Sequence, residues 1–121
     1  MVKDNVRFIE HKGKNVLLIS FAGVDFEELV QVVKAAREII QSAHHNSILA
    51  LTDATDAHLS PAMAKALKEF TTENGPYIKA SAVFGMSRLS RALYEAVIRF
   101  SRRKIVTFAS KEEALDYLVN Q

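Results

Sequence analysis

Apolar, strand-like runs alternate with complete helix-start signals along this chain of 121 residues, and this alternation restricts the fold more than any other feature. Asp25 and Glu28 have the spacing of a capping box, in which each side chain bonds the backbone N–H of the other residue. Ser110 and Glu113 repeat this spacing, and Ser60-Pro61 places a capping serine before a proline suited to the first helical turn. The expected strands cover residues 6–11, 16–23, 47–52, 79–84 and 105–108, and the expected helices cover residues 25–43, 60–74, 87–103 and 110–118.

The order of these elements, β-β-α-β-α-β-α-β-α, predicts a single α/β domain over residues 1–121. Strands separated by helices need crossover connections, so we expect the later strands to be parallel and buried on both faces. The first two strands flank Lys12-Gly13-Lys14-Asn15, which predicts an antiparallel hairpin. The expected fold is therefore a mixed sheet of about five strands, mostly parallel, with the helices packed on it.

The residue types that the chain lacks exclude several kinds of chemistry. There is no cysteine, which excludes disulfides, thiolate metal sites and thiol nucleophiles. None of the four histidines has a helical i, i+4 partner and the four glycines stand singly, so we expect no metal site, no phosphate-binding loop and no cofactor. The N-terminus lacks the apolar core of a signal peptide, and no apolar run is long enough for a transmembrane segment; we expect a cytoplasmic protein.

Three segments resemble a known family of bacterial domains. They are LTDATDAHLSP at residues 51–61, PYIKASAVFG at residues 76–85 and VTFASKEEALDYL at residues 106–118. Together they resemble STAS-like proteins, the small SpoIIAA-like domains of the anti-sigma-factor-antagonist type, whose fold is grouped with the CRAL-TRIO lipid-transfer type. The resemblance covers nearly the whole chain, and it implies a sheet with helices on it and a non-enzymatic regulatory or binding role.

The chain departs from this family at the phosphorylation motif. In the anti-sigma antagonists, a phosphorylatable serine lies in an Asp-Ser-Ser-Gly-like stretch at a helix start. The matching stretch here is His58-Leu59-Ser60-Pro61-Ala62, which has no Asp or Gly and places Pro61 where the modified serine would lie. The resemblance therefore does not transfer the phospho-switch to Ser60.

The region after the third expected strand holds four candidate ligand-binding or regulatory residues, which are Asp53, Thr55, Asp56 and Ser60. Open α/β sheets bind ligands beyond the carboxyl ends of parallel strands, where this segment is expected. The alternative is that the aspartates and Thr55 form local turns and Ser60 only caps its helix. Nothing nearby in the sequence supplies a nucleophile or an oxyanion hole, so we do not expect an enzyme.

The expected helix 87–103 combines a core face with a basic stripe. At about 100° per residue, the core face comprises Leu89, Leu93, Ala96, Val97 and Phe100. The opposite stripe comprises Arg88, Arg91, Arg99 and Arg102 with Glu95 inside it, and Tyr94 and Ile98 lie on the flank between the two faces. Such a surface suits an acidic protein, phosphates or an anionic membrane surface, and the alternative is an ordinary solvated face. Nucleic-acid binding is not expected, because Glu95 interrupts the stripe and no aromatic platform accompanies it.

The expected helix 25–43 carries more apolar surface than one sheet face requires. The predicted sheet-facing residues are Phe26, Leu29, Val30, Val33, Ala36 and Ile40. Val32, Ile39 and Ala43 widen this face, so a neighbouring helix, a second subunit or a ligand must cover them. Val32 and Ile39 therefore define a candidate homodimer interface. The head of Arg37, in the same arc, is expected to reach a carboxylate or solvent.

Three functions remain open at this point. The first is a STAS-like regulatory or protein-interaction module. The second is a carrier or sensor of a small apolar, lipid-like ligand, which requires an apolar pocket of roughly several hundred Å³ with a few polar groups. The third, an enzyme of unknown type, is the one that the sequence favours least.

Overall fold

The computed structural model describes residues 2–101 and 105–121, of which residues 2, 3 and 97–101 are described by their backbone alone. The strands are β1 (Val6–His11), β2 (Lys14–Ser20), β3 (Ile48–Asp53), β4 (Ile78–Phe84) and β5 (Ile105–Phe108). The helices are α1 (Val2–Asn5), α2 (Phe26–Gln41), α3 (Pro61–Asn74), α4 (Arg88–Ser101) and α5 (Lys111–Val119), with a 3-10 turn, η1, at Gly75–Tyr77. The predicted order of strands and long helices is confirmed, and α1 and η1 are additions to it.

The sheet has five strands in the order β1-β2-β3-β4-β5, which is also their order in the chain. β1 and β2 form the predicted antiparallel hairpin, with Val6 opposite Ile19, and every later pair is parallel. The hairpin turns at Lys12 and Gly13, whose φ angles of 49° and 81° are the positive values that a tight hairpin turn needs. The predicted mixed, mostly parallel sheet is therefore correct.

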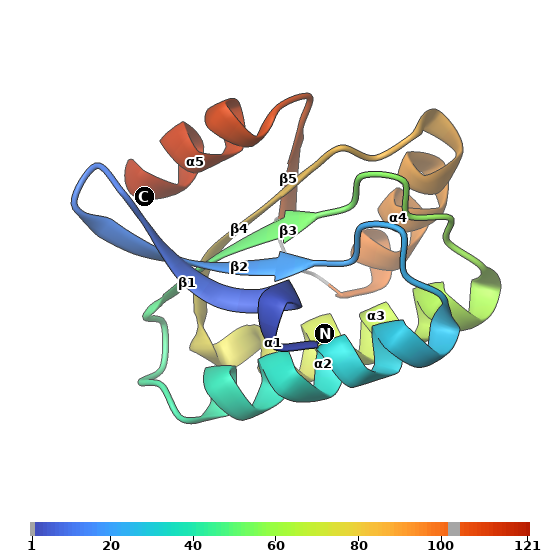
Figure 1. Ribbon diagram of the computed structural model, residues 1–121, viewed down its shortest axis with the longest axis horizontal. Coiled ribbons are helices and arrows are strands. Elements are labelled where there is room, and N and C mark those ends of the chain that lie inside the picture. The colour runs from blue at the N-terminus through green and yellow to red at the C-terminus, as the bar shows by residue number, and fades with distance from the viewer. Residues whose placement is uncertain (1, 102–104) are drawn as a thin grey trace.

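The strand order also decides which helix covers which face. Each crossover steps to the next strand in the same direction, so right-handed connections place α2, α3 and α4 on one face of the sheet. The opposite face is covered by α5, as Figure 1 shows. Alternate residues of β2 point to the two layers: Leu17 and Ile19 pack with the α2 and α3 side, whereas Leu18 packs with α5.

The helix starts use the capping residues that the sequence indicates. The backbone N–H of Glu28 donates to Asp25 Oδ1 at 2.8 Å, and the N–H of Asp25 donates to Glu28 Oε1 at 3.2 Å, which completes the capping box. Ser110 Oγ accepts from the N–H of Glu113 at 3.2 Å. The carboxylate of Glu113, however, accepts from the Ser110 hydroxyl at 3.1 Å, so the second cap is not a reciprocal box.

Candidate functional site

The loop after β3 uses its polar side chains for its own conformation. Asp53 Oδ1 accepts from the backbone N–H of Thr55 at 3.0 Å, which is an Asx turn. Asp56 follows with a positive φ of 55°, and both Thr55 and Asp56 are exposed. These contacts are the local turns that the sequence left as the alternative to a ligand site.

Ser60 lies at the start of α3 and caps it. Its Oγ accepts from the backbone N–H of Met63 at 3.2 Å, and Pro61 occupies the first helical turn. Within the described residues, no hydrogen bond or ion pair joins Ser60 to Asp53 or Asp56. The four candidate residues therefore belong to two separate backbone features, a turn and a cap.

Gly85, at the end of β4, holds the neighbouring loop in close contact. Its φ is 84°, and a Cβ at this position would collide with the Thr55 hydroxyl and come within 3.0 Å of the Thr55 backbone nitrogen. The N–H of Ala54 also donates to the carbonyl of Phe84 at 2.9 Å. The loops after β3 and β4 are thus packed directly on one another. The sequence signal for this contact is a glycine directly after a strand.

The predicted core face of α4 is wrong at Leu89 and Ala96, which are exposed, and Leu93 is half-buried; the side chains of Val97 and Phe100 lie outside the described residues. Leu89, expected in the core, is 86% exposed, whereas Ser90 and Tyr94 are buried at 6% and 7% exposure. The reason is local fit: the Ser90 hydroxyl donates to the carbonyl of Ala57 at 3.0 Å, and Tyr94 packs in the cluster that contains Val83. The spacing of apolar residues predicts a core face from apolar residues alone. It therefore cannot predict that a serine is buried because its hydroxyl donates a hydrogen bond to a buried carbonyl.

This rotation changes the proposed interaction surface on α4. Tyr94, predicted on an exposed flank, belongs to the core. Arg88 and Arg91 are exposed as predicted, and Arg91 Nε pairs with Glu95 Oε1 on the same helix at 3.2 Å. The side chains of Ile98 and Arg99, and all of Arg102, lie outside the described residues. The basic stripe therefore remains a prediction beyond its first two arginines.

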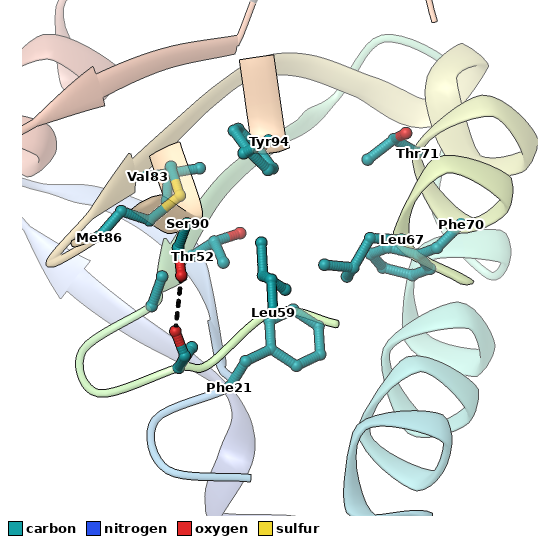
Figure 2. Close-up of a pocket in the computed structure, with 12 residues that line it drawn as sticks. Phe21, Thr52, Leu59, Leu67, Phe70, Thr71, Val83, Met86, Ser90 and Tyr94 are labelled. Carbon is teal, nitrogen blue, oxygen red and sulfur yellow. Dashed lines mark hydrogen bonds between the residues drawn. The ribbon is translucent and has the colours of Figure 1, made fainter. Parts of the chain in front are cut away.

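A small, mostly apolar cavity lies between the sheet and the helices α3 and α4, as Figure 2 shows. Its volume is about 40 Å³, which suffices for a few water molecules but not for the pocket of several hundred Å³ expected for a lipid-like ligand. A second hollow of about 30 Å³ adjoins it and shares Phe70 and Tyr94 as lining residues. Among the described residues, none that lines the first cavity is charged; the described lining is Phe21, Thr52, Ala54, Ala57, Leu59, Leu67, Phe70, Thr71, Val83, Met86, Ser90 and Tyr94.

The apolar face of α2 is also rotated from its predicted position. Val32 is 1% exposed, and Ile39 is half-buried and packs on the same core, so the chain itself covers the predicted homodimer residues. Phe26 and Val30, predicted to face the sheet, are each 45% exposed. The physical reason is that α2 packs against both the sheet and α3, which centres its buried stripe between these two neighbours. Val32 is therefore a core residue, and the neighbouring helix α3, one of the three alternatives, accounts for its burial.

The exposed apolar residues of α2 border a groove between α2 and α3 of about 390 Å³. This α2/α3 groove is lined by Phe26, Val30, Val33, Lys34 and Arg37 of α2 and by Ala66, Glu69, Phe70 and Glu73 of α3. At one end, Arg37 Nε lies 3.4 Å from Glu73 Oε1 without a hydrogen bond, which confirms that the Arg37 head reaches a carboxylate. The opposite end, around Phe26 and Val30, is apolar.

A charged cluster ties the β1–β2 hairpin to α5. Lys12 Nζ and His11 Nε2 lie 2.8 Å and 2.9 Å from Asp116 Oδ1. Hydrogen bonds from Lys12 and then from His11 lower the pKa of Asp116 below its usual value, and the bond to Asp116 raises the pKa of Lys12. Lys14 Nζ also donates to the carbonyl of Val119 at 2.6 Å. The sequence does not reveal this cluster, because its members lie about a hundred residues apart.

Comparisons with known proteins place the fold. The mixed five-stranded sheet, with three helices on one face and α5 on the other, defines a small α/β module. An uncharacterized protein from the DUF3478 family with a SpoIIAA-like fold, from Shewanella loihica PV-4, has a solved structure that matches this chain with a TM-score of 0.74. The match covers 93% of this chain and 91% of that chain at 21% sequence identity. This chain therefore has a SpoIIAA-like fold, and the STAS-like resemblance is confirmed at the level of fold.

Other comparisons are negative. No family model matches the chain, and no curated protein matches it. In residues 2–101 and 105–121, no three His, Asp or Glu side chains are grouped as metal ligands. No helix in the same part of the chain is long and apolar enough to cross a membrane.

Proposed function

We propose that this chain is a non-enzymatic protein-interaction module of the STAS-like type, and that it takes an amphipathic helix of a protein partner in the α2/α3 groove. The observation that carries the proposal is the exposure of Phe26 and Val30, each 45%, at the apolar end of that groove. Exposed apolar residues that border a common hollow are typical of interaction surfaces. The cavity under α3 and α4, at about 40 Å³, is much smaller than this groove of about 390 Å³.

The shape of the groove suits a helix. α2 and α3 each lead from one parallel strand to the next, so they run in the same direction and the α2/α3 groove lies along both helices. Val33 and Phe70 form a buried floor, and Phe26 and Val30, spaced i and i+4, form one apolar edge. Amphipathic helices bind hydrophobic grooves of this kind through their apolar stripe. Lys34 and Glu69 line the groove beyond this apolar edge, so the bound helix should carry charged residues beside its apolar stripe.

Two local contacts favour a role in binding over catalysis. The carboxylate of Asp53 accepts from Thr55, and the hydroxyl of Ser60 accepts from Met63. A side chain that holds the backbone of its own loop or helix is less available to attack a substrate or move a proton. The proposal therefore assigns no reaction to the loop after β3.

Site-specific photo-crosslinking in the source organism tests this function. A benzophenone amino acid at Val30 should give a discrete adduct with one protein. The crosslinked peptide, identified by mass spectrometry, should have the apolar spacing of an amphipathic helix. The matched control is Gln31, the next residue of α2, which is exposed but does not line the groove. A second variant, Ala66→Glu, adds a charged side chain to the groove and should abolish the Val30 adduct. Equal adducts from Val30 and Gln31, or none from either, would contradict the proposal.

The cavity under α3 and α4 supports a second candidate function, the binding of a small uncharged apolar ligand. It lies at the carboxyl ends of the parallel strands, where open α/β sheets bind ligands. The described residues of its lining supply hydroxyl groups but no charge, so an ionised group beside them would lose its hydration without compensation. A ligand larger than the cavity of about 40 Å³ also requires lining residues such as Leu59 and Phe70 to move.

Two measurements test this second candidate. Native mass spectrometry of freshly purified protein should show a retained uncharged molecule. Added 1-hexanol should raise Tm, whereas hexanoate at the same concentration should not, because none of the described residues that line the cavity is a cation. No retained mass together with no Tm change from the alcohol would rule the candidate out.

A further inference from the structure

We infer that the two walls of the α2/α3 groove pack against the same two walls of a second copy of this chain, so that the protein forms a two-fold symmetric dimer. The inference rests on the proposed function of the groove and names its partner. It also moves the homodimer contact from Val32, which the chain buries, to Phe26 and Val30, which it leaves exposed.

The charges on the two walls of the groove are complementary to the charges on the same walls of a second copy. The α2 wall carries Lys34 and the α3 wall carries Glu69. Both side chains are exposed, and in the described part of the chain neither has an ion-pair partner. A two-fold interface requires each surface to match its own copy, since every contact occurs twice with the roles exchanged. A groove with one cationic wall and one acidic wall meets this requirement.

The direction of the helices allows these contacts to form together. Because α2 and α3 run in the same direction, residues that line the same hollow lie at similar heights along it. A two-fold axis along the groove then places α2 of each copy over α3 of the other. Lys34 meets Glu69 of the partner subunit, and Lys34 of the partner subunit meets Glu69. Two opposite-charge contacts result from one arrangement.

The same arrangement covers the exposed apolar residues. Phe26 and Val30 of each copy lie against the α3 wall of the other, where Ala66 leaves room for them. Helices of 16 and 14 residues present a face of roughly 500 Å², smaller than the roughly 800 Å² per partner of a standard stable interface. We therefore expect a dimer that depends on protein concentration.

Sedimentation velocity over a concentration series tests the inference. The wild-type protein should shift from monomer to dimer as concentration rises, and Lys34→Glu or Glu69→Lys alone should weaken the dimer about tenfold or more, because each places like charges together. An equimolar mixture of the two single variants should dimerise again, since their contacts regain opposite charges. The matched control Glu38→Lys changes an exposed α2 residue outside the groove and should leave the dimer unchanged. Circular dichroism checks that each variant is folded.

The outcomes separate this inference from the function on which it rests. A wild-type protein that stays monomeric at every concentration overturns the second copy as partner. So does a mixture of the single variants that remains as weakly associated as each variant alone. If the Val30 crosslink then identifies a different protein, the groove function stands without the dimer. If neither position-specific crosslink nor dimer is found, both fail.

Discussion

The two faces of the sheet differ in how completely they are closed. Under α5, the core residues Val16, Leu51 and Leu118 are fully buried, and Lys12 and Lys14 of the hairpin bind the end of α5. Under α2, α3 and α4, the structure leaves a cavity between sheet and helices and a groove between two helices. We call the side of α5 the closed face, and we call the side of α2, α3 and α4, which keeps these two hollows, the open face.

The comparison predicts that substitutions on the closed face act through stability and leave binding intact. Leu118→Ala should have the largest effect, a loss of about 2–5 kcal/mol, because a fully buried leucine is replaced by a cavity that neighbours cannot fill. Urea denaturation measures this loss. Association through the groove should persist wherever the variant is folded, and a variant that is folded but no longer associates would show that the two faces are coupled.

In the loop directly after β4, Gly85→Ala should destabilise the protein by about 1–3 kcal/mol, since φ at this position is positive and the new Cβ collides with Thr55. The matched control is Gly75→Ala. There φ is −49° and nothing lies within 4 Å of the added Cβ, so the substitution should be neutral or slightly stabilising. Thermal unfolding of both variants would settle the difference, and equal Tm changes would contradict the close contact of the two loops.

A second pair of variants tests the open face, where α4 buries Ser90 instead of the predicted Leu89. Ser90→Ala should cost about 1–3 kcal/mol, because the carbonyl of Ala57 loses its buried donor. Leu89→Ser, one residue away, should change the stability by less than about 0.5 kcal/mol, since Leu89 is exposed. Chemical denaturation gives both values. A larger loss of stability in Leu89→Ser than in Ser90→Ala would contradict this arrangement and would support the core face that hydrophobic periodicity predicts.

The smallest effect is expected at the exposed Asp116 cluster, and it depends on pH. The lowered pKa of Asp116 means that its contribution is present above the unfolded value near 3.8 and is lost as pH falls through the folded value. The raised pKa of Lys12 means that its contribution is present below 10.5 and is lost as pH rises through its folded value. Asp116→Asn should therefore lower Tm near neutral pH, and the difference from wild type should shrink towards both extremes. A difference that does not vary with pH would argue against this ion pair.

Most of the fold follows from local signals in the sequence. The capping box at Asp25, the serine cap at Ser60 and the hairpin turn at Lys12-Gly13 each use neighbouring residues, so short segments predict them correctly. The alternation of strands and helices then restricts the later strands to parallel pairing. The order of the strands in the sheet, which these local signals do not specify, places three helices on one face.

The candidate surfaces were less predictable, because they depend on how the elements meet. The sequence indicated that α2 has surplus apolar residues, but it placed Phe26 in the core and left open what covers Val32; in the structure Phe26 is exposed and Val32 is buried in the core that α2 shares with α3. Its prediction for α4 failed because the hydrogen bond from Ser90 to Ala57 connects residues 33 positions apart. The α2/α3 groove needs two helices at once, and no single segment carries a signal for it.

The sequence by itself thus determined the five strands, the four long helices and the parallel pairing of the later strands, since these follow from capping, periodicity and the need for crossover connections. Only the tertiary structure decided which side of α2 and α4 is buried, how small the cavity under α4 is and where the groove lies. The reason is that an amphipathic helix of this kind has more apolar surface than one contact requires. The side that becomes buried is selected by all neighbours together, including a carbonyl that needs a donor and a second helix that packs alongside.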